Sequence, residues 1–429
     1  TKKVKETFNV EETKEVAEKK GLNVTFVKEN VQHPLVKTYE AQEAEVLLNK
    51  ELQREESGRS TRHIEISLPN GVSYKEGDHL GILPQNSAEL VNRVLKRYGL
   101  DGSESIMLEG DAYGLQHLPL NKPVRVRDVL TFNVELQEPV SRKALQELAE
   151  ATVCPPHKYE LEALLGEHYS ENVTNKRLTM LSLLEKYEAC ELSFERFLTL
   201  CPPLKPRYYS ISSSPLKSSQ KASITVSVVE GKAWSGDGMY HGVASSYLAQ
   251  CQAGENVMMF INTPQSRFEL PADESTPLIM VGPGTGVAPF RGFLQARSVL
   301  NEEGKTLGEA HLYFGCRNEA HDFIYKDELE KAESDGIVTL HTAFSRMESC
   351  DKTYVQHLLE QDAAEVISIL VEKEGALYIC GDGKSMAPAV ESTLKKAYQD
   401  IEHKSEEEAE RFLLDLEEQG RFAKDVWAG

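Results

Sequence analysis

The sequence predicts a multidomain β plus α/β protein, in which an antiparallel β-barrel with an inserted helical connecting domain precedes a parallel α/β domain. Segments of alternating apolar and polar residues, typical of antiparallel strands, fall in two blocks, residues 34–86 and 201–270. Helical periodicity fills residues 87–200 between them, so we expect the helices to interrupt the barrel. Strands and helices then alternate over residues 271–429, while residues 1–33 are charged and weakly patterned and have the composition of a linker whose upstream neighbour is missing.

The two β blocks contain the expected barrel strands, residues 38–52, 60–68, 72–83, 207–212, 222–230 and 256–262. In the helical block, the stretch Asn86-Ser87-Ala88-Glu89 is expected to cap an amphipathic helix, and further helices are expected to cover residues 141–153 and 181–200. The α/β domain has expected strands at residues 278–281, 310–315, 337–343 and 376–380. Its expected helices are residues 288–301, 354–361 and 386–398.

The composition excludes several classes of protein. The chain has 429 residues, of which 40% are apolar, and its formal charge of −20 argues against nucleic acid as a partner. The seven cysteines are widely spaced without a Cys-x-x-Cys pair, so we expect free thiols and no metal site. Because no stretch resembles a membrane span or a signal peptide, we expect a cytoplasmic protein with no membrane partner.

Residues 276–291 combine a short apolar strand, a loop with alternating glycines and a helix start at Pro289. A helix N-terminus offers unpaired N–H groups and a partial positive charge, so it favours a nucleotide phosphate. The usual dinucleotide pattern has an acidic residue after the next strand, whereas here that strand is followed by Arg317, which favours a phosphorylated ribose. The alternative is a loop that only turns the chain.

Every expected strand of the α/β domain ends in residues suited to a ligand, namely residues 282–286, 316–317, 345–346 and 381–383. Ligands of parallel sheets bind beyond the carboxyl ends of the strands. We therefore expect these four strand ends to form one nucleotide site.

A second site is indicated at Arg207-Tyr208-Tyr209-Ser210, which joins a cation for a diphosphate, a flat ring for stacking and a hydroxyl for a heteroaromatic nitrogen. Further on, residues 242–245 open a helix whose N–H groups suit the same diphosphate. A flavin nucleotide needs all of these groups. Each piece alone is more often an ordinary strand surface, and only their combination favours the flavin.

These motifs resemble the FAD/NADPH portion of the diflavin reductase family, which contains NADPH-cytochrome P-450 reductase, sulfite reductase flavoprotein and the nitric-oxide synthase reductase region. From residue 34 onward they follow the order of the family: RYYSISSS, GVAS, VGPGTGVAPFRGF, YFGCR, AFSR, KTYVQH, YICGDG and DVWAG. The chain is most similar to the reductase end of self-sufficient bacterial fatty-acid hydroxylases, in which a heme-thiolate domain, an FMN domain and this module share one polypeptide. The resemblance implies an FAD-binding barrel and a ferredoxin-NADP reductase-like NADP-binding domain, and it implies that residues 1–33 are the linker from a missing FMN domain.

The resemblance also assigns roles by position. For FAD it implies Arg207 at the diphosphate, Tyr209 stacked on the isoalloxazine ring, Ser210 near N5, Thr225 and Val226 along the ring, and Gly242, Val243, Ala244 and Ser245 as a second diphosphate loop. For NADPH it implies Gly284, Thr285 and Gly286 at the diphosphate, and Arg317, Ser345, Arg346, Lys352, Tyr354 and Gln356 at the adenosine end. On the nicotinamide side it implies Asp382 and, with Ser210, the catalytic residues Cys380, Asp425 and Trp427.

The expected reaction is hydride transfer from NADPH to FAD, followed by release of single electrons to a flavodoxin-like FMN domain and on to a heme-thiolate monooxygenase domain of the same full-length chain. A sulfite reductase flavoprotein remains an alternative. A stand-alone ferredoxin or flavodoxin reductase is another, although such an enzyme has no need of the long helical insertion. The motifs also leave open a protein of a different class, a module that binds nucleotides without catalysing a reaction.

Overall fold

The computed structural model describes residues 35–109, 114–232, 239–347 and 351–427, so the linker predicted at residues 1–33 lies outside the described part. Six antiparallel strands form the first sheet: β1 (Gln42–Glu51), β2 (Thr61–Ser67), β3 (His79–Leu83), β6 (Arg207–Ser210), β7 (Lys221–Ser227) and β10 (Asn256–Asn262). Their order is β6-β3-β10-β1-β2-β7, and a bridge between Ile211 and Ile224 brings the two edge strands together. The sheet therefore curves into a barrel around an apolar core.

The predicted strand at residues 72–83 is shorter in the structure, because only His79–Leu83 pairs with its neighbours. Gly71 and Gly77, which precede this strand, both have positive φ values and turn the chain. Residues 38–52 likewise divide into a short helix α3 (Val36–Tyr39) and β1.

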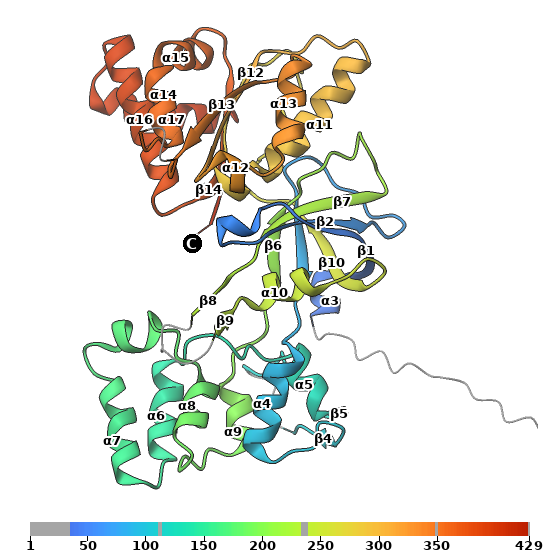
Figure 1. Ribbon diagram of the computed structural model, residues 1–429, viewed down its shortest axis with the longest axis vertical. Helices are drawn as coiled ribbons and strands as arrows, with labels where there is room; N and C mark the ends of the chain where they lie inside the picture. Colours follow the sequence, from blue (N-terminus) through green and yellow to red (C-terminus); the bar gives the residue numbers. More distant parts are fainter. Residues whose placement is uncertain (1–34, 110–113, 233–238, 348–350, 428–429) are drawn as a thin grey trace, which may run out of the picture. The chain divides into compact units, whose positions relative to one another are not determined.

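The helical block lies between β3 and β6 in the chain (Figure 1). It comprises α4 (Ala88–Tyr98), α5 (Val126–Phe132), α6 (Arg142–Glu150), α7 (Pro155–Leu164), a π-helical turn (Ser170–Thr174), α8 (Met180–Lys186), α9 (Phe194–Leu200) and the small strand pair β4 (Ser105–Met107) and β5 (Pro123–Arg125). These elements share their own apolar core. The single helix predicted at residues 181–200 is in fact two, because Tyr187 leaves helical geometry and Ser193 caps a new helix.

Five parallel strands form the second sheet: β11 (Leu278–Val281), β12 (Ala310–Cys316), β13 (Thr339–Phe344), β14 (Ala376–Asp382) and β15 (Phe422–Trp427). Their order is β13-β12-β11-β14-β15. The helices on one face are α11 (Ala288–Glu302), α12 (Glu319–Asp322) and α13 (Lys326–Ser334), and those on the other are α14 (Val355–Gln361), α15 (Ala363–Val371), α16 (Met386–Glu402) and α17 (Glu406–Glu418) (Figure 1). The predicted fold class is confirmed, although β15 was not expected from the sequence.

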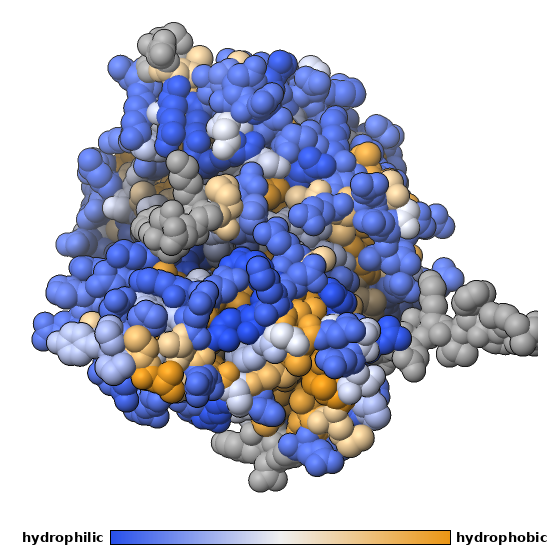
Figure 2. All heavy atoms as spheres, turned by 60° about the horizontal axis from the view of Figure 1, so that its bottom comes forward, coloured by the Kyte–Doolittle hydropathy of each residue, from blue (hydrophilic) through white to orange (hydrophobic). Residues whose placement is uncertain are grey.

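The remaining elements are the 3₁₀ turns Glu55–Ser57 and Gly284–Val287, the strand pair β8 (Glu230–Lys232) and β9 (Met239–His241), and α10 (Val243–Gln250). Among the described residues, none of the helices combines the length and the apolar character needed to cross a membrane. Figure 2 shows a largely hydrophilic face with apolar patches on its lower part. Within the helical block, the exposed large apolar side chains of the described residues include Met107, Val153 and Tyr159.

A buried polar network joins the barrel to the α/β domain. The Tyr325 hydroxyl lies 2.7 Å from the Thr225 hydroxyl and 2.9 Å from Nδ1 of His63. Arg291 donates to the carbonyl oxygen of Ser212 at 2.7 Å and pairs with Glu328 through both ends of its guanidinium group. Because buried polar groups are costly to leave unpaired, these bonds fix the two sheets relative to each other and thereby set the geometry of any site between them.

Candidate functional site

The first cavity, of about 560 Å³, lies between the barrel, the helical block and the end of β15. It is lined by Glu135, Gln137, Glu138, Pro139, Arg177, Arg207, Tyr208, Tyr209, Ser227, Val229, Tyr240, Gly242, Val243, Ala244, Ser245 and Trp427. The structure thus brings together the two segments that the sequence indicated for a flavin nucleotide, the start of β6 and the start of α10. Tyr209 also packs against the barrel core, and burial raises the pKa of its hydroxyl.

Arg207 stands at the start of β6 with a side chain that is 45% exposed. Its Nη1 donates to the carbonyl oxygen of Lys205 at 2.9 Å, and its Nη2 donates to Oε2 of Glu135 at 3.4 Å. These contacts use two of the five N–H groups of the guanidinium, and within the part of the chain that the structure describes the others have no protein partner. Arg207 is therefore free to bind an anion.

A second cation of this cavity, Arg177, was not identified from the sequence. It follows the π-helical turn of the helical block and has a positive φ of 50°. Its guanidinium carbon lies 4.4 Å from the ring centre of Tyr240, so a residue of the helical block contacts the β8–β9 pair of the barrel. Nothing in the local sequence distinguishes it from other exposed arginines.

The turn into α10 has the shape of an anion cradle. The Val229 N–H donates to the Ser245 hydroxyl at 3.0 Å, and the Gly242 N–H donates to the Val229 carbonyl at 2.6 Å. A Cβ at position 242 would lie 2.7 Å from Oγ of Ser245 and 2.9 Å from Cβ of Val229, so only glycine fits. The first turn of α10 presents backbone N–H groups beside two arginines, and this donor set fits a diphosphate.

Thr225 and Val226 lie outside the first cavity. Val226 is fully buried in the barrel core, and the Thr225 hydroxyl bonds Tyr325 in the interdomain network. Neither is among the residues that line the first cavity. Their predicted place along the flavin ring stays a prediction, and it would have to involve backbone atoms.

The second cavity, of about 750 Å³, gathers all four strand ends of the α/β sheet that the sequence singled out. Its lining includes Gly284 and Thr285 after β11, Cys316 and Arg317 at the end of β12, Ser345 after β13 and Asp382 at the end of β14, together with Tyr354, Gln356 and Trp427. The strand ends are also tied to each other, because Arg346 N–H donates to the Arg317 carbonyl at 2.8 Å. The nucleotide-sized space therefore lies where a parallel sheet places its ligand.

The glycine loop after β11 is packed tightly against β14. A Cβ at Gly286 would lie 2.2 Å from the carbonyl oxygen of Cys380, so this glycine is needed for the close approach of the two strands. Gly284 has a φ of +58° and open space around it. Gly284 and Thr285 thus face the cavity, whereas Gly286 holds the loop in place.

Arg59 is a further cation that the sequence did not indicate. It follows the 3₁₀ turn between β1 and β2, and this turn is tied to the α/β domain because Arg54 N–H donates to the His321 carbonyl at 2.9 Å. Burial, and then the nearby Arg346 guanidinium, lower the pKa of Arg59, while Asp322 acts in the opposite sense. Two like charges from different domains held this close favour an anion nearby, and Arg59 itself lines the second cavity.

The remaining residues predicted at the adenosine end lie at the start of α14. Tyr354 is 41% exposed, and the Lys352 ammonium lies 5.1 Å from its ring centre. Ser345 faces the end of β12, with its hydroxyl 3.5 Å from the Cys316 carbonyl. An exposed aromatic ring can stack on an adenine, and a hydroxyl together with cations can bind a phosphate.

Asp382 is engaged by its own loop. Its carboxylate accepts from the Ser385 hydroxyl and from the backbone N–H groups of Lys384, Ser385 and Met386. These bonds, the Ser385 hydroxyl first, lower the pKa of Asp382 to about 2. Asp382 therefore shapes the turn before α16, and its predicted contact with a coenzyme stays a prediction.

A compact polar cluster lies where the two sheets meet. His79 and Ser210 are opposite each other on β3 and β6, and Cys380 and Asp425 are opposite each other on β14 and β15. The Ser210 hydroxyl donates to Oδ2 of Asp425 at 2.6 Å, while Nε2 of His79 lies 3.0 Å and Sγ of Cys380 lies 4.0 Å from the same oxygen. The structure thus brings together three of the predicted catalytic residues and adds His79.

Cys380 has no solvent exposure, and burial, followed by the Asp425 charge, raises the pKa of its thiol well above the usual value. The thiol therefore stays protonated and can donate to Asp425. Among the described residues, no group of three or more His, Cys, Asp or Glu side chains is placed to hold a metal ion.

Trp427 joins the two cavities, since it lines both of them together with Ser227. Its backbone pairs with Asp382, and its carbonyl accepts from Gly383 N–H at 2.8 Å. The side chain is 42% exposed. It is thus anchored through the backbone while its ring remains accessible, which argues against a simple plug of the α/β domain.

Comparison with known proteins agrees with this division into two cavities. An FAD binding domain family matches residues 36–247, and an oxidoreductase NAD-binding domain family matches residues 280–392. These two ranges contain most of the residues that line the first and the second cavity, respectively.

Three curated relatives illustrate the similarity. The bifunctional cytochrome P-450/NADPH-P-450 reductase 1 of Bacillus subtilis is 59% identical over 96% of this chain, which covers 39% of that protein. Reductase 2 of the same organism is 54% identical over 99% of this chain and 41% of the relative. The NADPH-cytochrome P-450 reductase of Dictyostelium discoideum is 38% identical over 90% of this chain and 58% of the relative.

The chain spans about two fifths of the length of the bifunctional relatives, and the match is to their reductase part. The two matched domain families, the order of the motifs and the two cavities support the same assignment, an FAD-binding part followed by an NAD-binding part. The chain belongs to the diflavin reductase family, and it corresponds to the FAD-binding and NAD-binding part of the cytochrome P-450/NADPH-P-450 reductase fusion proteins.

Proposed function

We propose that this chain is the FAD-containing reductase module that takes hydride from NADPH and passes electrons one at a time to an FMN domain, and from there to a heme-thiolate monooxygenase domain on the same full-length protein. The observation that carries the proposal is that the two cavities meet at Trp427 and Ser227, next to the Asp425 cluster. The names of the relatives, which join a cytochrome P-450 to an NADPH-dependent reductase, support the monooxygenase partner domain.

In this proposal FAD binds in the first cavity and NADPH in the second. Arg207, Arg177 and the start of α10 hold the flavin diphosphate, and Tyr209 and Trp427 are placed to cover the ring. FAD, when bound, supplies the chemistry, because it accepts a hydride and gives up electrons singly. The protein contributes orientation and exclusion of water at the point where the cavities meet.

The second cavity supports a preference for a phosphorylated coenzyme. Gly284 and Thr285 would hold the diphosphate, and the cations Arg59, Arg346 and Lys352 would share the ribose phosphate with Ser345. Arg317 would contribute a further cation, and Tyr354 and Gln356 would contact the adenosine. No carboxylate takes the place that an NAD-specific site uses for the ribose hydroxyl at the end of β12, where the chain has Arg317.

The Asp425 cluster fixes the protons near the reacting atoms. Oδ2 of Asp425 accepts from the Ser210 hydroxyl, so the hydroxyl proton is directed at the carboxylate and the oxygen lone pairs of Ser210 remain available. His79 and Cys380 hold the same carboxylate from two other strands. The cluster can therefore stabilise a developing positive charge at the nicotinamide without covalent catalysis.

The bounds of the parts are also proposed, namely a linker at residues 1–33, barrel segments at 34–86 and 201–270, the helical connecting domain at 87–200 and the NADPH domain at 271–429. The helical domain is well suited to hold the FMN domain near the flavin. A tether between the FMN domain and this chain also raises the effective concentration of the FMN domain at that place. The six free cysteines among the described residues fit a reducing compartment, and we infer a cytoplasmic location.

An absorbance spectrum of the purified chain, recorded without air before and after NADPH is added, tests the proposal directly. We expect a flavin spectrum with about one FAD and no FMN per chain, and bleaching of the flavin band by NADPH. A colourless chain that binds nucleotides without turnover would instead make it a binding module.

The partner domain is tested by two electron acceptors. The isolated chain should reduce ferricyanide, which can take electrons directly from FAD, but should reduce cytochrome c slowly, because that protein is expected to receive electrons through FMN. Addition of the matching FMN domain should restore cytochrome c reduction. Rapid cytochrome c reduction by the chain alone would favour a stand-alone reductase over the fusion module.

A further inference from the structure

We propose that Glu135 makes flavin binding proton-linked, such that the chain takes up one proton from solvent when the flavin diphosphate joins Glu135 as a partner of Arg207. The inference rests on the proposed FAD site. It concerns a carboxylate of the helical block that contacts a cation assigned to the diphosphate.

The backbone of Glu135 is fixed beside the strand that carries Arg207. The Glu135 N–H donates to the Pro202 carbonyl at 2.8 Å, the Leu204 N–H donates to the Asn133 carbonyl at 3.1 Å, and Val134 bridges Pro203. This pairing immediately precedes β6. Glu135 therefore cannot move far from Arg207 when the first cavity fills.

The side chain of Glu135 is equally confined. It is 5% exposed, its Oε1 accepts from the Gln137 N–H at 3.0 Å, and its Oε2 accepts from Nη2 of Arg207 at 3.4 Å. A buried carboxylate needs either a cation or a proton. In the structure, Arg207 is the cation that accompanies the Glu135 carboxylate.

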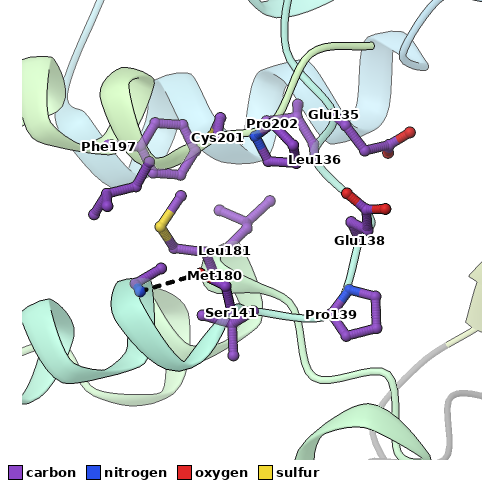
Figure 3. Close-up of a pocket in the computed structure, with 13 residues that line it drawn as sticks. Glu135, Leu136, Glu138, Pro139, Ser141, Met180, Leu181, Phe197, Cys201 and Pro202 are labelled. Atoms are coloured by element: carbon purple, nitrogen blue, oxygen red, sulfur yellow. Dashed lines mark hydrogen bonds between the residues drawn. The ribbon is translucent and has the colours of Figure 1, made fainter. Parts of the chain in front are cut away.

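Glu135 borders two cavities. Besides the first cavity, it lines a smaller one of about 170 Å³ in the helical block, together with apolar residues such as Leu181 and Phe197. Figure 3 shows the Glu135 and Glu138 carboxylates at the same end of this smaller cavity, away from Phe197. Among the described residues that line this smaller cavity, Glu138 is the only charged neighbour of Glu135 and none is a cation, so the cavity gives the Glu135 charge no compensating partner.

A diphosphate in the first cavity changes this balance. It brings negative charge to Arg207, so the guanidinium no longer compensates Glu135 alone, and the two anions repel each other across it. Binding a proton removes this repulsion. The proton comes from solvent and joins a carboxylate oxygen of Glu135, and no other bond forms or breaks.

The surrounding groups make Glu135 the suitable proton acceptor. Burial is the main cause that raises the pKa of Glu135, the Gln137 N–H and then Arg207 oppose that effect, and the Glu138 charge adds to it. The other charged or titratable groups that face it are Cys201 at the end of α9, whose thiol pKa is raised by burial, and Arg177 across the first cavity. Near neutral pH, the arginine and the thiol both keep their protons.

The sign of the effect follows from linkage. Because the pKa of Glu135 is higher with flavin bound than without, FAD binds most tightly at low pH, and the affinity falls as pH rises through the interval between the two pKa values. Within that interval one proton per flavin makes the dissociation constant increase about tenfold per pH unit. Outside it the dissociation constant is independent of pH.

The test uses the flavin-loaded chain. Samples are diluted at several pH values between about 5 and 8, and the fluorescence of released FAD gives the dissociation constant, with circular dichroism to verify the fold. The wild type should show the rising dissociation constant. Glu135→Gln, which resembles the protonated state, should bind FAD as tightly at the high end of this range as the wild type does at the low end, with little pH dependence.

Glu138→Gln is the matched control, because this exposed carboxylate borders the same two cavities, whereas Glu135 is the carboxylate that contacts Arg207. It should keep the tenfold change per pH unit of the wild type, with the sensitive interval moved to somewhat lower pH because the Glu138 charge no longer raises the pKa of Glu135. A purely structural role of Glu135 would make Glu135→Gln bind FAD more weakly at every pH, and this result would overturn the proposal.

A second measurement needs no variant. When FAD is displaced from the wild-type chain in weakly buffered solution, a pH indicator should report about one proton released per flavin within the sensitive interval. If FAD binds and is released without proton exchange, the proposed role of Glu135 is refuted while the proposed function is not. Absence of FAD binding by the wild type would instead contradict the proposed function.

Discussion

Replacement of Trp427 by alanine should shift the coenzyme preference from NADPH toward NADH. In the proposed complex the Trp427 ring covers the flavin, and it must move aside before the nicotinamide can reach that place. NADPH can compensate for the lost stacking through its contacts with Arg59, Arg346 and Lys352 at the ribose phosphate, whereas NADH cannot. Removal of the ring should therefore help NADH most.

The structure sets the expected size of this effect. The side chain is already 42% exposed, so little general burial is lost, and the term that matters is the specific aromatic stacking of about 0.5–1.5 kcal/mol. This range corresponds to a gain of about 2- to 13-fold in kcat/KM for NADH. The strand should survive, because the backbone pairing with Asp382 and the bond from Gly383 do not depend on the ring.

The assay compares kcat/KM for NADH and NADPH with ferricyanide as acceptor, after the FAD content of each sample has been determined from its absorbance. Trp427→Phe is the control, because it keeps a stacking ring and should retain most of the NADPH preference. Release of oxidised NADP should slow in the alanine variant. An unchanged ratio of the two coenzymes in a variant that keeps its FAD would show that Trp427 is structural and that the gate lies elsewhere.

Three further outcomes are expected. Arg207→Ala should weaken FAD binding by about 10- to 150-fold, the value of one charge-assisted contact, and full FAD occupancy after desalting would contradict this assignment. Combined replacement of Arg346 and Lys352 by alanine should raise KM for NADPH by about tenfold or more while leaving NADH nearly unchanged, and equal losses with both coenzymes would place the phosphate site elsewhere. Burial, followed by Arg291, lowers the pKa of His63 from 6.5 to about 4, so the unfolded chain binds the extra proton first as pH falls. Between about pH 7 and pH 5, His63 should therefore remove about 2 kcal/mol from the free energy of unfolding, and urea titrations of His63→Asn should lack this part of the pH dependence.

The local elements of the nucleotide sites could be predicted from the sequence because their signals are local. An apolar strand, a glycine loop and a helix start lie within residues 276–291, and the structure has β11, a 3₁₀ turn and α11 there. The strand ends could also be grouped in advance, since parallel strands end at one edge of a sheet. The single helix expected at residues 181–200 was wrong, because apolar spacing alone does not reveal a break of a few residues.

Only the tertiary structure identified Arg59, Arg177, His79 and Glu135. Each is a single polar residue without a surrounding motif, and its partner comes from a distant part of the chain, as His79 and Asp425 illustrate with a separation of 346 residues. Such contacts depend on how the helical block and the two sheets pack together, which periodicity does not encode. The same packing brings the Thr225 hydroxyl within hydrogen-bond distance of the Tyr325 hydroxyl. The sequence thus determined the elements and the two cofactor classes, whereas the packing of distant segments decided which charges meet, because electrostatic partners are set by distance in space and not along the chain.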